Sequence, residues 1–314
     1  MLCVGLDTDF AKIPECLKAG RTVGEAVLEF NKRIIDATAP HCVAFKPNLA
    51  FYECLGVDGM AILDKTVDYI RSNHSEQFII ADAKRGDIGN TARMYAKSLF
   101  ETFDFDAVTL SPYMGSETVT PFLEYPGRYA IVVALSSNPS SVDFQTAEKG
   151  GKPLYQVVME RMMEISTPEN MMFVVGATKA DKLKEIRCFC PDNFFLVPGV
   201  GAQGGSAEEV IANGANSKGG LLINSSRGVL YASSAEDFAE AAAAVAARTA
   251  TLEPPESFLE KVKSPSASAI PAESRPRSLI CASAGEKTRL IVTAELPCGV
   301  VIGIMWRKNV SYRP

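Results

Sequence analysis

The fold is decided by the stretch Phe78-Ile79-Ile80-Ala81-Asp82-Ala83-Lys84-Arg85-Gly86-Asp87, in which an apolar run leads directly into a run of charges. The apolar half has the composition of a strand covered on both faces, as in parallel sheets. Side chains two residues apart on a strand share a face, so Asp82 and Lys84 are expected to point the same way. A buried charge costs several kcal/mol unless it is closely paired. The stretch therefore predicts a parallel strand that ends in paired charges.

Short β-like runs alternate with longer amphipathic segments along the chain. This alternation predicts a parallel sheet, and eight repeats within about 250 residues predict a closed (β/α)8 TIM barrel of the α/β class. An open doubly wound sheet is the alternative, although no Gly-x-Gly-x-x-Gly follows the first strand. The predicted strands are 2–5, 42–46, 79–82, 107–110, 130–135, 172–176, 194–198 and 220–224. The predicted helices are 23–38, 59–73, 91–103, 153–166, 180–188, 207–213 and 235–249.

Almost every predicted strand ends in polar or glycine-rich sequence. In a barrel the carboxyl ends of all strands meet at one face, which is where active sites lie. We therefore expect one site built from all these ends. They carry Asp7, Lys46, Asp82, Lys84, Ser111-Pro112-Tyr113, Ser136-Ser137-Asn138, the glycine-rich loop after 198, and Asn224-Ser225-Ser226-Arg227-Gly228.

Composition narrows the class of protein. The 314 residues are 47% hydrophobic and 22% charged, as in ordinary globular proteins. The net charge of −5 gives no support for a nucleic-acid or membrane partner. Eight cysteines without a Cys-x-x-Cys pair predict reduced thiols and a cytoplasmic location. Only two histidines, His41 and His74, are present, and we expect both to be structural rather than part of a metal site or a Ser-His-Asp triad.

The sequence changes character near its end. Residues 254–277 are rich in Pro, Ser, Ala and charge, which is typical of a linker. Residues 290–306 are apolar but too short and interrupted for a membrane span. We therefore expect a barrel at 1–253 and, at 254–314, a linker and extension of unknown structure. The chain opens on the first predicted strand, so the bottom of the barrel is expected to lack a covering helix.

Two loops carry a phosphate-binding pattern. The stretch Val197-Pro198-Gly199-Val200-Gly201-Ala202-Gln203-Gly204-Gly205 follows predicted strand seven, and Asn224-Ser225-Ser226-Arg227-Gly228 follows strand eight. Glycines let backbone N–H groups approach an anion, and Arg227 can bind phosphate oxygens with its guanidinium fork. Loops after strands seven and eight are the usual phosphate site of such barrels. Ordinary glycine-rich turns are the alternative for each loop alone.

Taken together, these motifs resemble the orotidine 5′-phosphate decarboxylase family, in its bacterial and protozoan-like branch. The resemblance covers residues 1–250 and follows the family's order. It rests on Val4-Gly5-Leu6-Asp7, Phe45-Lys46-Pro47-Asn48, Asp82-Ala83-Lys84-Arg85-Gly86-Asp87-Ile88-Gly89-Asn90-Thr91, Ser136-Ser137-Asn138-Pro139, Val174-Val175-Gly176-Ala177-Thr178, and the two phosphate-loop stretches. It implies a homodimeric enzyme, without cofactor or metal, that converts orotidine 5′-monophosphate to UMP in pyrimidine biosynthesis. Fusion to, or association with, an orotate phosphoribosyltransferase, as in some UMP synthases, is left open.

The resemblance also implies roles for single residues. Lys46, Asp82, Lys84 and Asp87 form the catalytic charge array, with Asp87 and Thr91 reaching into the partner subunit's site. Asp7 holds a ribose hydroxyl with help from Lys46, and Ser137 or its neighbour Ser136 reads the pyrimidine edge. Gln203 and Arg227 take the phosphate. The remaining substrate-binding residues are Asn48, Pro198 and Ser226.

The residue types fit that chemistry. Loss of CO2 leaves a carbanion at pyrimidine C6, and an ammonium fixed between two carboxylates stays cationic and can stabilise and protonate it. One rival is a Mg²⁺-dependent sugar-phosphate lyase of the same superfamily, which has an acidic metal ligand at the position of Lys46. A cation there repels Mg²⁺. The other rival is a non-catalytic nucleotide-binding barrel, which a turnover assay distinguishes.

Overall fold

The computed structural model of the chain describes residues 1–200, 205–251, 280–283, 288–296 and 299–305. The described residues fall into two compact units, one up to residue 251 and the other from 280 to 305. The boundary predicted between residues 253 and 254 lies outside the described residues.

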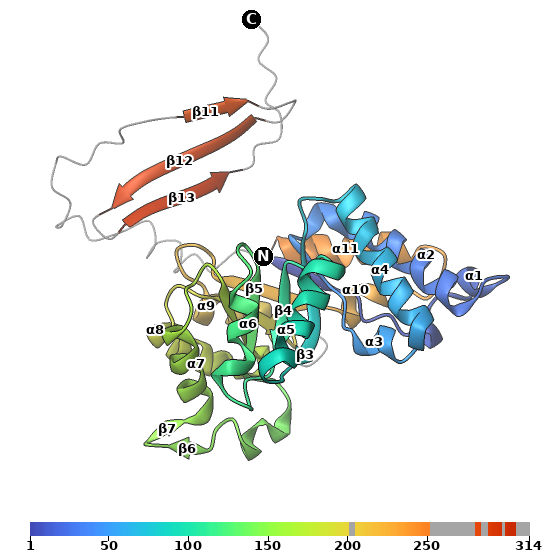
Figure 1. Ribbon diagram of the computed structural model, residues 1–314. Coiled ribbons are helices and arrows are strands. Elements are labelled where there is room, and N and C mark those ends of the chain that lie inside the picture. Colours follow the sequence, from blue (N-terminus) through green and yellow to red (C-terminus); the bar gives the residue numbers. More distant parts are fainter. Residues whose placement is uncertain (201–204, 252–279, 284–287, 297–298, 306–314) are drawn as a thin grey trace, which may run out of the picture. The chain divides into compact units, whose positions relative to one another are not determined.

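Eight parallel strands of the larger unit close into a barrel (Figure 1), so the predicted (β/α)8 TIM barrel is confirmed and the open sheet is excluded. Their order around the barrel is β1-β10-β9-β8-β5-β4-β3-β2, and β1 closes it by pairing with both β2 and β10. The strands are β1 (Leu2–Gly5), β2 (Ala44–Lys46), β3 (Phe78–Arg85), β4 (Ala107–Leu110), β5 (Tyr129–Leu135), β8 (Met171–Val175), β9 (Phe194–Pro198) and β10 (Leu221–Ser225).

Helices follow the strands and cover the outside of the barrel. In Figure 1 the helices α2 and α11, from opposite ends of this unit, lie side by side, and the rings of Phe30 and Phe238 stack at 5.1 Å between them. The first turn of α2 is fixed by a capping box of Thr22 and Glu25. The helices are α1 (Glu15–Lys18), α2 (Val23–Thr38), α3 (Ala50–Glu53), α4 (Gly56–Asn73), α5 (Gly89–Lys97), α6 (Thr120–Leu123), α7 (Leu154–Glu164), α8 (Ala180–Phe189), α9 (Ala207–Gly214), α10 (Arg227–Leu230) and α11 (Phe238–Ala250).

Inside the barrel, a buried apolar cluster takes at least one side chain from each strand. Its members are Cys3, Ala44, Ile80, Ala107, Ile131, Met172, Val174, Leu196 and Leu222. Because side chains two apart on a strand share a face, the next inward positions toward the carboxyl ends include Lys46, Asp82, Thr109, Pro198 and Asn224. The barrel therefore has an apolar layer directly beneath a polar one.

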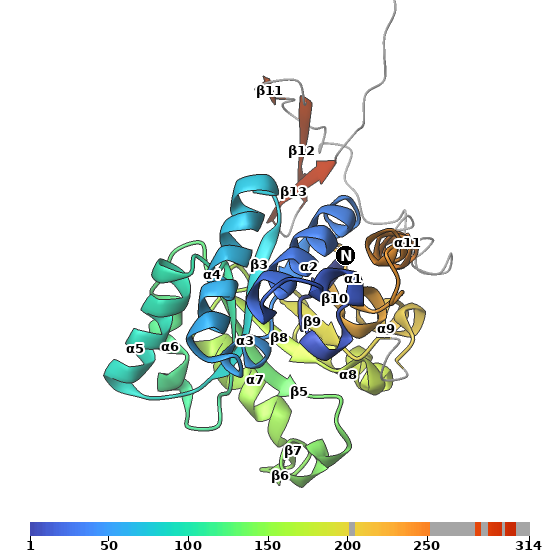
Figure 2. The same ribbon diagram turned by 90° about the vertical axis from the view of Figure 1, so that its right-hand side faces the viewer.

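The long predicted elements are confirmed, and the differences lie in short ones. Segment 91–103 is α5 followed by a π-helical turn, η3 (Ser98–Thr102), and the four-residue helices α1, α3, α6 and α10 were not predicted. A small hairpin, β6 (Glu148–Lys149) with β7 (Lys152–Pro153), stands beside α7 at the lower edge of this unit in Figure 2. Gly150 and Gly151 make its turn with φ of 63° and 77°, a conformation that favours glycine. Short 3-10 turns lie at η1 (Phe10–Lys12), η2 (Ala39–His41), η4 (Ser116–Thr118), η5 (Pro139–Asp143) and η6 (Ala177–Lys179).

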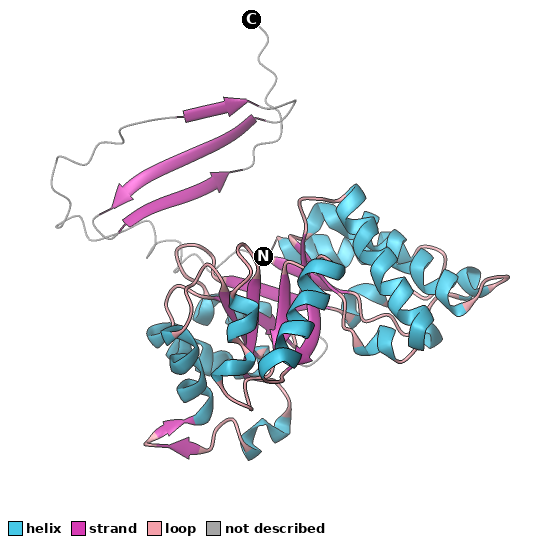
Figure 3. Ribbon diagram, in the orientation of Figure 1, coloured by secondary structure: helices cyan, strands magenta, loops and turns pink. Residues whose placement is uncertain are grey.

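The smaller unit is a three-stranded antiparallel sheet, drawn in magenta with the other strands in Figure 3. It consists of β11 (Ile280–Ser283), β12 (Thr288–Leu296) and β13 (Gly299–Met305), with β12 in the middle. No strand was predicted there. Among the described residues, none of the helices has the length and apolar character needed to cross a bilayer.

Candidate active site

A carboxylate between two ammonium groups forms the centre of the barrel mouth. Asp82 Oδ2 lies 2.8 Å from Lys46 Nζ, and Asp82 Oδ1 lies 2.6 Å from Lys84 Nζ. The Lys46 side chain is 4% exposed and that of Asp82 10%, whereas that of Lys84 is 56% exposed. Lys46 and Asp82 are thus fixed by burial, and Lys84 presents its ammonium group to the solvent above them.

The pKa values follow from this pairing. Burial alone raises the pKa of Asp82, but Lys46 and Lys84 lower it more, so its pKa falls well below the ordinary range. Burial likewise lowers the pKa of Lys46, but Asp82 and Asp7 raise it above its ordinary value. Asp82 and Lys46 are therefore an ionised pair at neutral pH.

The backbone between Asp82 and Lys84 is not a regular strand. Lys84 has φ of 45°, in the left-handed region, and the register of β3 on β4 shifts between Ala81 and Arg85. Both residues lie in β3 and their side chains meet as predicted, although the register shift interrupts the regular alternation on which the prediction was based. A left-handed conformation costs a non-glycine residue about 1–2 kcal/mol. Strain of this kind persists where the surrounding contacts determine the conformation.

Asp7 lies at the edge of this cluster, where the first and last strands meet. Its Oδ2 accepts a hydrogen bond of 2.8 Å from Ser226 Oγ, and its Oδ1 lies 3.9 Å from Lys46 Nζ. A Cβ atom on Gly5 would lie 2.7 Å from Ser226 Cβ, so only glycine allows this approach. Asp7 Oδ1 and Asn224 Oδ1 are both buried without a hydrogen-bond partner. Such unsatisfied acceptors at a barrel mouth are suited to a ligand's donors.

The loop after β5 holds the two predicted serines. Ser136 N donates to Gln145 Oε1 at 2.7 Å, and Gln145 Nε2 donates to Ser136 Oγ at 2.8 Å. Ser137 O accepts from Thr178 Oγ1 at 3.1 Å, and a Cβ atom on Gly176 would clash with the Ser137 backbone. Gln145 was not singled out from the sequence, since it lies nine residues after Ser136 in a loop without a motif.

The predicted phosphate loops are described in part. Pro198 is half-buried at the end of β9, and Gly199 has φ of 95°. Gln203 lies outside the described residues. Arg227 begins α10 with an exposed side chain, directly after Ser226. The described part of the two loops therefore starts at the same face as Asp82, because β3, β9 and β10 are parallel strands of one closed barrel.

Three further predicted residues lie around the central cluster. Asn48 forms a β-bridge with Asp82, and its Oδ1 accepts from Ala50 N at 3.2 Å. Asp87 Oδ1 accepts from Ile88 N at 2.8 Å, and its carboxylate makes no ion pair with Lys46 or Lys84. Thr91 is exposed on α5. The structure thus unites Lys46, Asp82, Lys84 and Asp7 but leaves Asp87 and Thr91 apart from them in one chain.

The two histidines are not part of this cluster. His74 pairs with Asp36 at 2.8 Å, and His41 lies in η2. The six cysteines of the barrel unit are free thiols, in agreement with the prediction for this part of the chain. Within the described ranges no group of three His, Cys, Asp or Glu side chains is placed to hold a metal ion.

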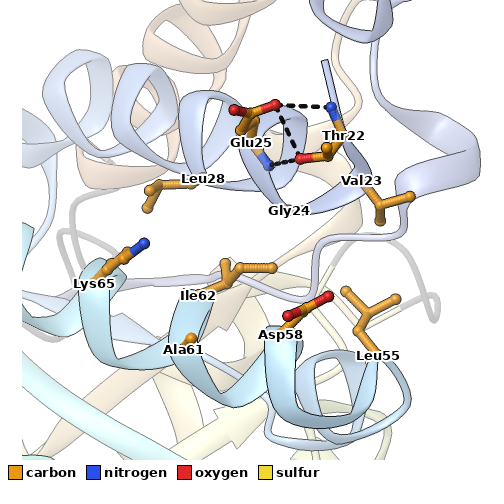
Figure 4. Close-up of a pocket in the computed structure, with 10 residues that line it drawn as sticks. All are labelled: Thr22, Val23, Gly24, Glu25, Leu28, Leu55, Asp58, Ala61, Ile62 and Lys65. Carbon is orange, nitrogen blue, oxygen red and sulfur yellow. Dashed lines mark hydrogen bonds between the residues drawn. The ribbon is translucent and has the colours of Figure 1, made fainter.

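A separate cleft of about 660 Å³ lies between α2 and α4 (Figure 4). Its polar residues Thr22 and Glu25 bond to each other in the capping box, and Asp58 and Lys65 line it from α4. It contains none of the predicted site residues. The chemistry therefore belongs to the barrel mouth rather than to this cleft.

Comparison with known proteins supports the family resemblance that the sequence motifs indicate. The sequence profile described as "Orotidine 5'-phosphate decarboxylase / HUMPS family" matches residues 1–244. The orotidine 5′-phosphate decarboxylase of Phocaeicola vulgatus is 54% identical over 242 residues, covering 77% of this chain and 88% of the relative. That of Christiangramia forsetii is 55% identical over 245 residues, covering 78% and 89%.

Solved structures show the same likeness. The OMP decarboxylase of Leishmania donovani has a TM-score of 0.67 at 34% identity, covering 80% of this chain and 94% of that one. The UMP synthase of the same organism has a TM-score of 0.69 at 37% identity over 79% of this chain. The matched part spans about half of that UMP synthase, 52%. On sequence and fold together, the chain belongs to the orotidine 5′-phosphate decarboxylase / HUMPS family.

Proposed function

We propose that this chain is a carboxy-lyase that converts orotidine 5′-monophosphate to UMP and CO2, the last step of pyrimidine nucleotide synthesis. The observation that carries the proposal is the Asp82 carboxylate held between Lys46 and Lys84 at the barrel mouth. Relatives more than 50% identical bear the name orotidine 5′-phosphate decarboxylase.

The reaction needs a fixed cation where negative charge develops. When the bond from C6 to the carboxylate breaks, its electron pair stays on C6 and CO2 leaves. Lys84 stabilises that charge and donates a proton to C6, giving UMP, and then regains a proton from water. Because Asp82 and the strained backbone orient its ammonium group beforehand, no reorganisation is needed during the reaction.

The rest of the mouth binds and orients the substrate. Asp7 Oδ1, which is buried without a hydrogen-bond donor, accepts from a ribose hydroxyl, with Lys46 beside it. Ser136 or Ser137 reads the pyrimidine edge, and Arg227 with Gln203 takes the phosphate. Asn48, Pro198 and Ser226 make further contacts with the substrate. Binding of the remote phosphate contributes energy to orientation at the reacting ring.

The Mg²⁺-dependent lyase is the less favourable reading of the same barrel. Asp82 is already neutralised by two lysines, and the buried Lys46 places a positive charge where that chemistry needs an anionic ligand. The deciding experiment follows the absorbance of orotidine 5′-monophosphate with and without a metal chelator. We expect equal rates in both. A rate abolished by the chelator would favour the lyase, and absence of turnover in both would favour a non-catalytic barrel.

We also propose that the active site is shared across a homodimer. Asp87 makes no ion pair with the catalytic lysines of its own chain, and apolar side chains gather on the same segment and on the loop after β4. These exposed side chains are Ile88, Met94, Tyr95, Tyr113 and Met114, with 36–83% of their surface exposed. Packing them against a second copy would bury them and carry Asp87 and Thr91 toward the partner's site.

Mixing two inactive variants tests this sharing. Lys84→Ala and Asp87→Ala are each expected to be inactive alone. In a mixed dimer one site carries both lesions and the other neither, so random exchange should restore about a quarter of wild-type activity. No recovery despite demonstrated subunit exchange would place Asp87 in its own chain's site.

The cellular setting stays a prediction. The free thiols of the barrel favour a cytoplasmic location. Association with an orotate phosphoribosyltransferase, fused or separate, is suggested by the likeness to a UMP synthase. The mass of the native gene product tests the fusion directly.

A further inference from the structure

Thr109 lies directly opposite the catalytic stretch and was not singled out from the sequence. It is the only polar residue of β4 and is 1% exposed. Between the register pairs Ala81–Val108 and Arg85–Leu110, β4 has this single residue, whereas β3 has Asp82, Ala83 and Lys84. One side chain therefore faces the whole irregular segment.

The hydroxyl group of Thr109 bonds to both catalytic residues. Its Oγ1 lies 3.0 Å from Asp82 Oδ1 and 3.0 Å from the backbone nitrogen of Lys84. An ionised carboxylate only accepts and a backbone N–H only donates. The hydroxyl proton must therefore point to Asp82, and the hydroxyl oxygen must accept from Lys84. Each hydrogen bond can therefore run in only one direction, and the single hydroxyl proton is used in the bond to Asp82.

We infer that Thr109 is a positioning residue for the decarboxylation, fixing the Asp82 carboxylate and the Lys84 backbone relative to each other. The inference rests on the proposed function of these two residues. Ordinary ladder pairing is interrupted at this point by the register shift, and Lys84 has φ of 45°. The Thr109 hydroxyl supplies the Lys84 N–H with an acceptor in this unfavourable conformation. It also leaves Asp82 Oδ1 oriented toward the Lys84 ammonium group.

Other buried threonines of the barrel unit act differently and provide a matched control. Thr38 and Thr66 are fully buried, and each bonds to the carbonyl four residues earlier in its own helix at 2.7 Å. Replacing Thr38 by valine removes a buried hydroxyl of the same size without touching the site. It reports what such a loss does to folding alone.

The test compares Thr109→Val, which keeps the shape, with Thr109→Ser, which keeps the hydroxyl. We expect Thr109→Val to lower kcat about 100-fold, as for a displacement of about 1 Å at a reacting group. KM, and the Kd for UMP measured by calorimetry, should change less than about threefold, because the substrate-binding groups stay in place. Thr109→Ser should recover most of the wild-type kcat. Thr38→Val should leave kcat unchanged while lowering the melting temperature.

Several results would overturn the inference. A wild-type kcat in Thr109→Val would do so, and so would equal losses in the serine and valine variants, since packing rather than the hydroxyl would then matter. A parallel loss of UMP affinity would indicate general damage to the site. If the valine variant does not fold, Thr109→Ala against Thr109→Ser decides the same question. A wild-type protein that fails to release CO2 refutes the proposed function instead, which keeps the two failures distinct.

Discussion

Two charged networks lie at opposite ends of the barrel, and each pairs two basic side chains with aspartates. At the carboxyl ends of the strands, Lys46 and Lys84 contact Asp82, with Asp7 beside them. At the amino ends, two arginines contact two aspartates. Among the described residues other than glycine, two have positive φ, and each network contains one of them. These are Lys84 and, in the second network, Asp104.

The network at the amino ends is closed in the sense that each carboxylate oxygen has a partner, although Arg71 Nε, 3.0 Å from Asp104 Oδ2, forms no hydrogen bond. Arg128 contacts Asp104 at 2.7 Å and Asp106 at 3.1 Å, and Arg71 contacts Asp106 at 2.8 Å and Asp104 at 3.0 Å. The second oxygen of Asp106 accepts from Ile79 N at 2.8 Å. Planar guanidinium groups suit such forked pairing.

The network at the carboxyl ends remains open. Lysines act as point charges with rotatable donors. Lys84 is more than half exposed, and Asp7 Oδ1 is buried without a donor. The comparison teaches two things about such ion pairs. Where every carboxylate oxygen has a partner, the ion pairs hold loops together. Where an ammonium group is exposed and a carboxylate oxygen has no donor, the same kinds of group can act on a ligand.

The strongest test of the comparison is Lys84→Ala. Turnover of orotidine 5′-monophosphate should fall by more than about 10⁴-fold, since electrostatic stabilisation and proton donation are lost together. The fold should survive, as judged by an unchanged circular dichroism spectrum. Lys182→Ala, which removes an exposed lysine paired with Glu185 on α8, is the matched control and should leave turnover unchanged. Near-normal turnover in Lys84→Ala would remove the functional distinction between the two networks.

Arg227→Ala tests whether the open end binds an anion. A charged hydrogen bond to phosphate contributes about 1.5–3 kcal/mol, so KM should rise roughly 10- to 150-fold, with a smaller fall in kcat. Steady-state kinetics on the nucleotide provide the measurement, and the phosphate-free nucleoside is the control. An equal loss with the nucleoside means that Arg227 is not the phosphate ligand.

Arg128→Met tests the closed end. It removes ion pairs to Asp104 and Asp106 and the bond to Phe105 O. Because Asp104 is half exposed, we expect a loss of only about 1–2 kcal/mol, or roughly 2–8 °C in Tm. The kcat of the folded enzyme should not change. Arg161→Met, at an exposed pair with Glu164, should change Tm less. A large fall in kcat with unchanged Tm would contradict the assignment of a purely structural role.

The pH dependence of stability sharpens the comparison further. The pKa of Asp82 is lowered in the folded state, so its contribution is present above its unfolded pKa of about 3.9 and is lost as the pH falls. The pKa of Lys46 is raised, so its contribution is present below about 10.4 and is lost at higher pH. The difference in unfolding free energy between wild type and Asp82→Asn should be flat from about pH 5 to 9 and shift against the wild type below about pH 4. Denaturant titrations at several pH values measure it, and a flat difference down to pH 2 would contradict the pairing.

The smallest effect is expected from ending the chain at residue 253. Both networks, and all predicted site residues, lie before this point. The shortened chain should keep its kcat/KM and Tm, as measured beside the full chain. Failure to fold would contradict the predicted domain boundary.

The sequence predicts the positions of the charges better than their geometry. Lys46 and Asp82 could be placed at strand ends, because apolar runs of strand length lead into them and parallel strand ends converge. The left-handed Lys84 and its partner Thr109 could not, since a register shift between β3 and β4 depends on contacts between distant segments. The role of Gln145 could not be predicted either, because nothing near it in the sequence indicates Ser136 as its partner. The trans role of Asp87 stays a prediction.

The hydrogen bond from Ser226 to Asp7 links residues 219 positions apart. During synthesis Asp7 leaves the ribosome long before Ser226 does. At about 5–20 residues per second, the interval is roughly 10–45 s. Loop-closure entropy makes contacts of such separation slow to form. The part of the site that contains Asp7 therefore assembles only when the last strand closes onto the first, so recovery of activity during refolding should report the completion of the barrel.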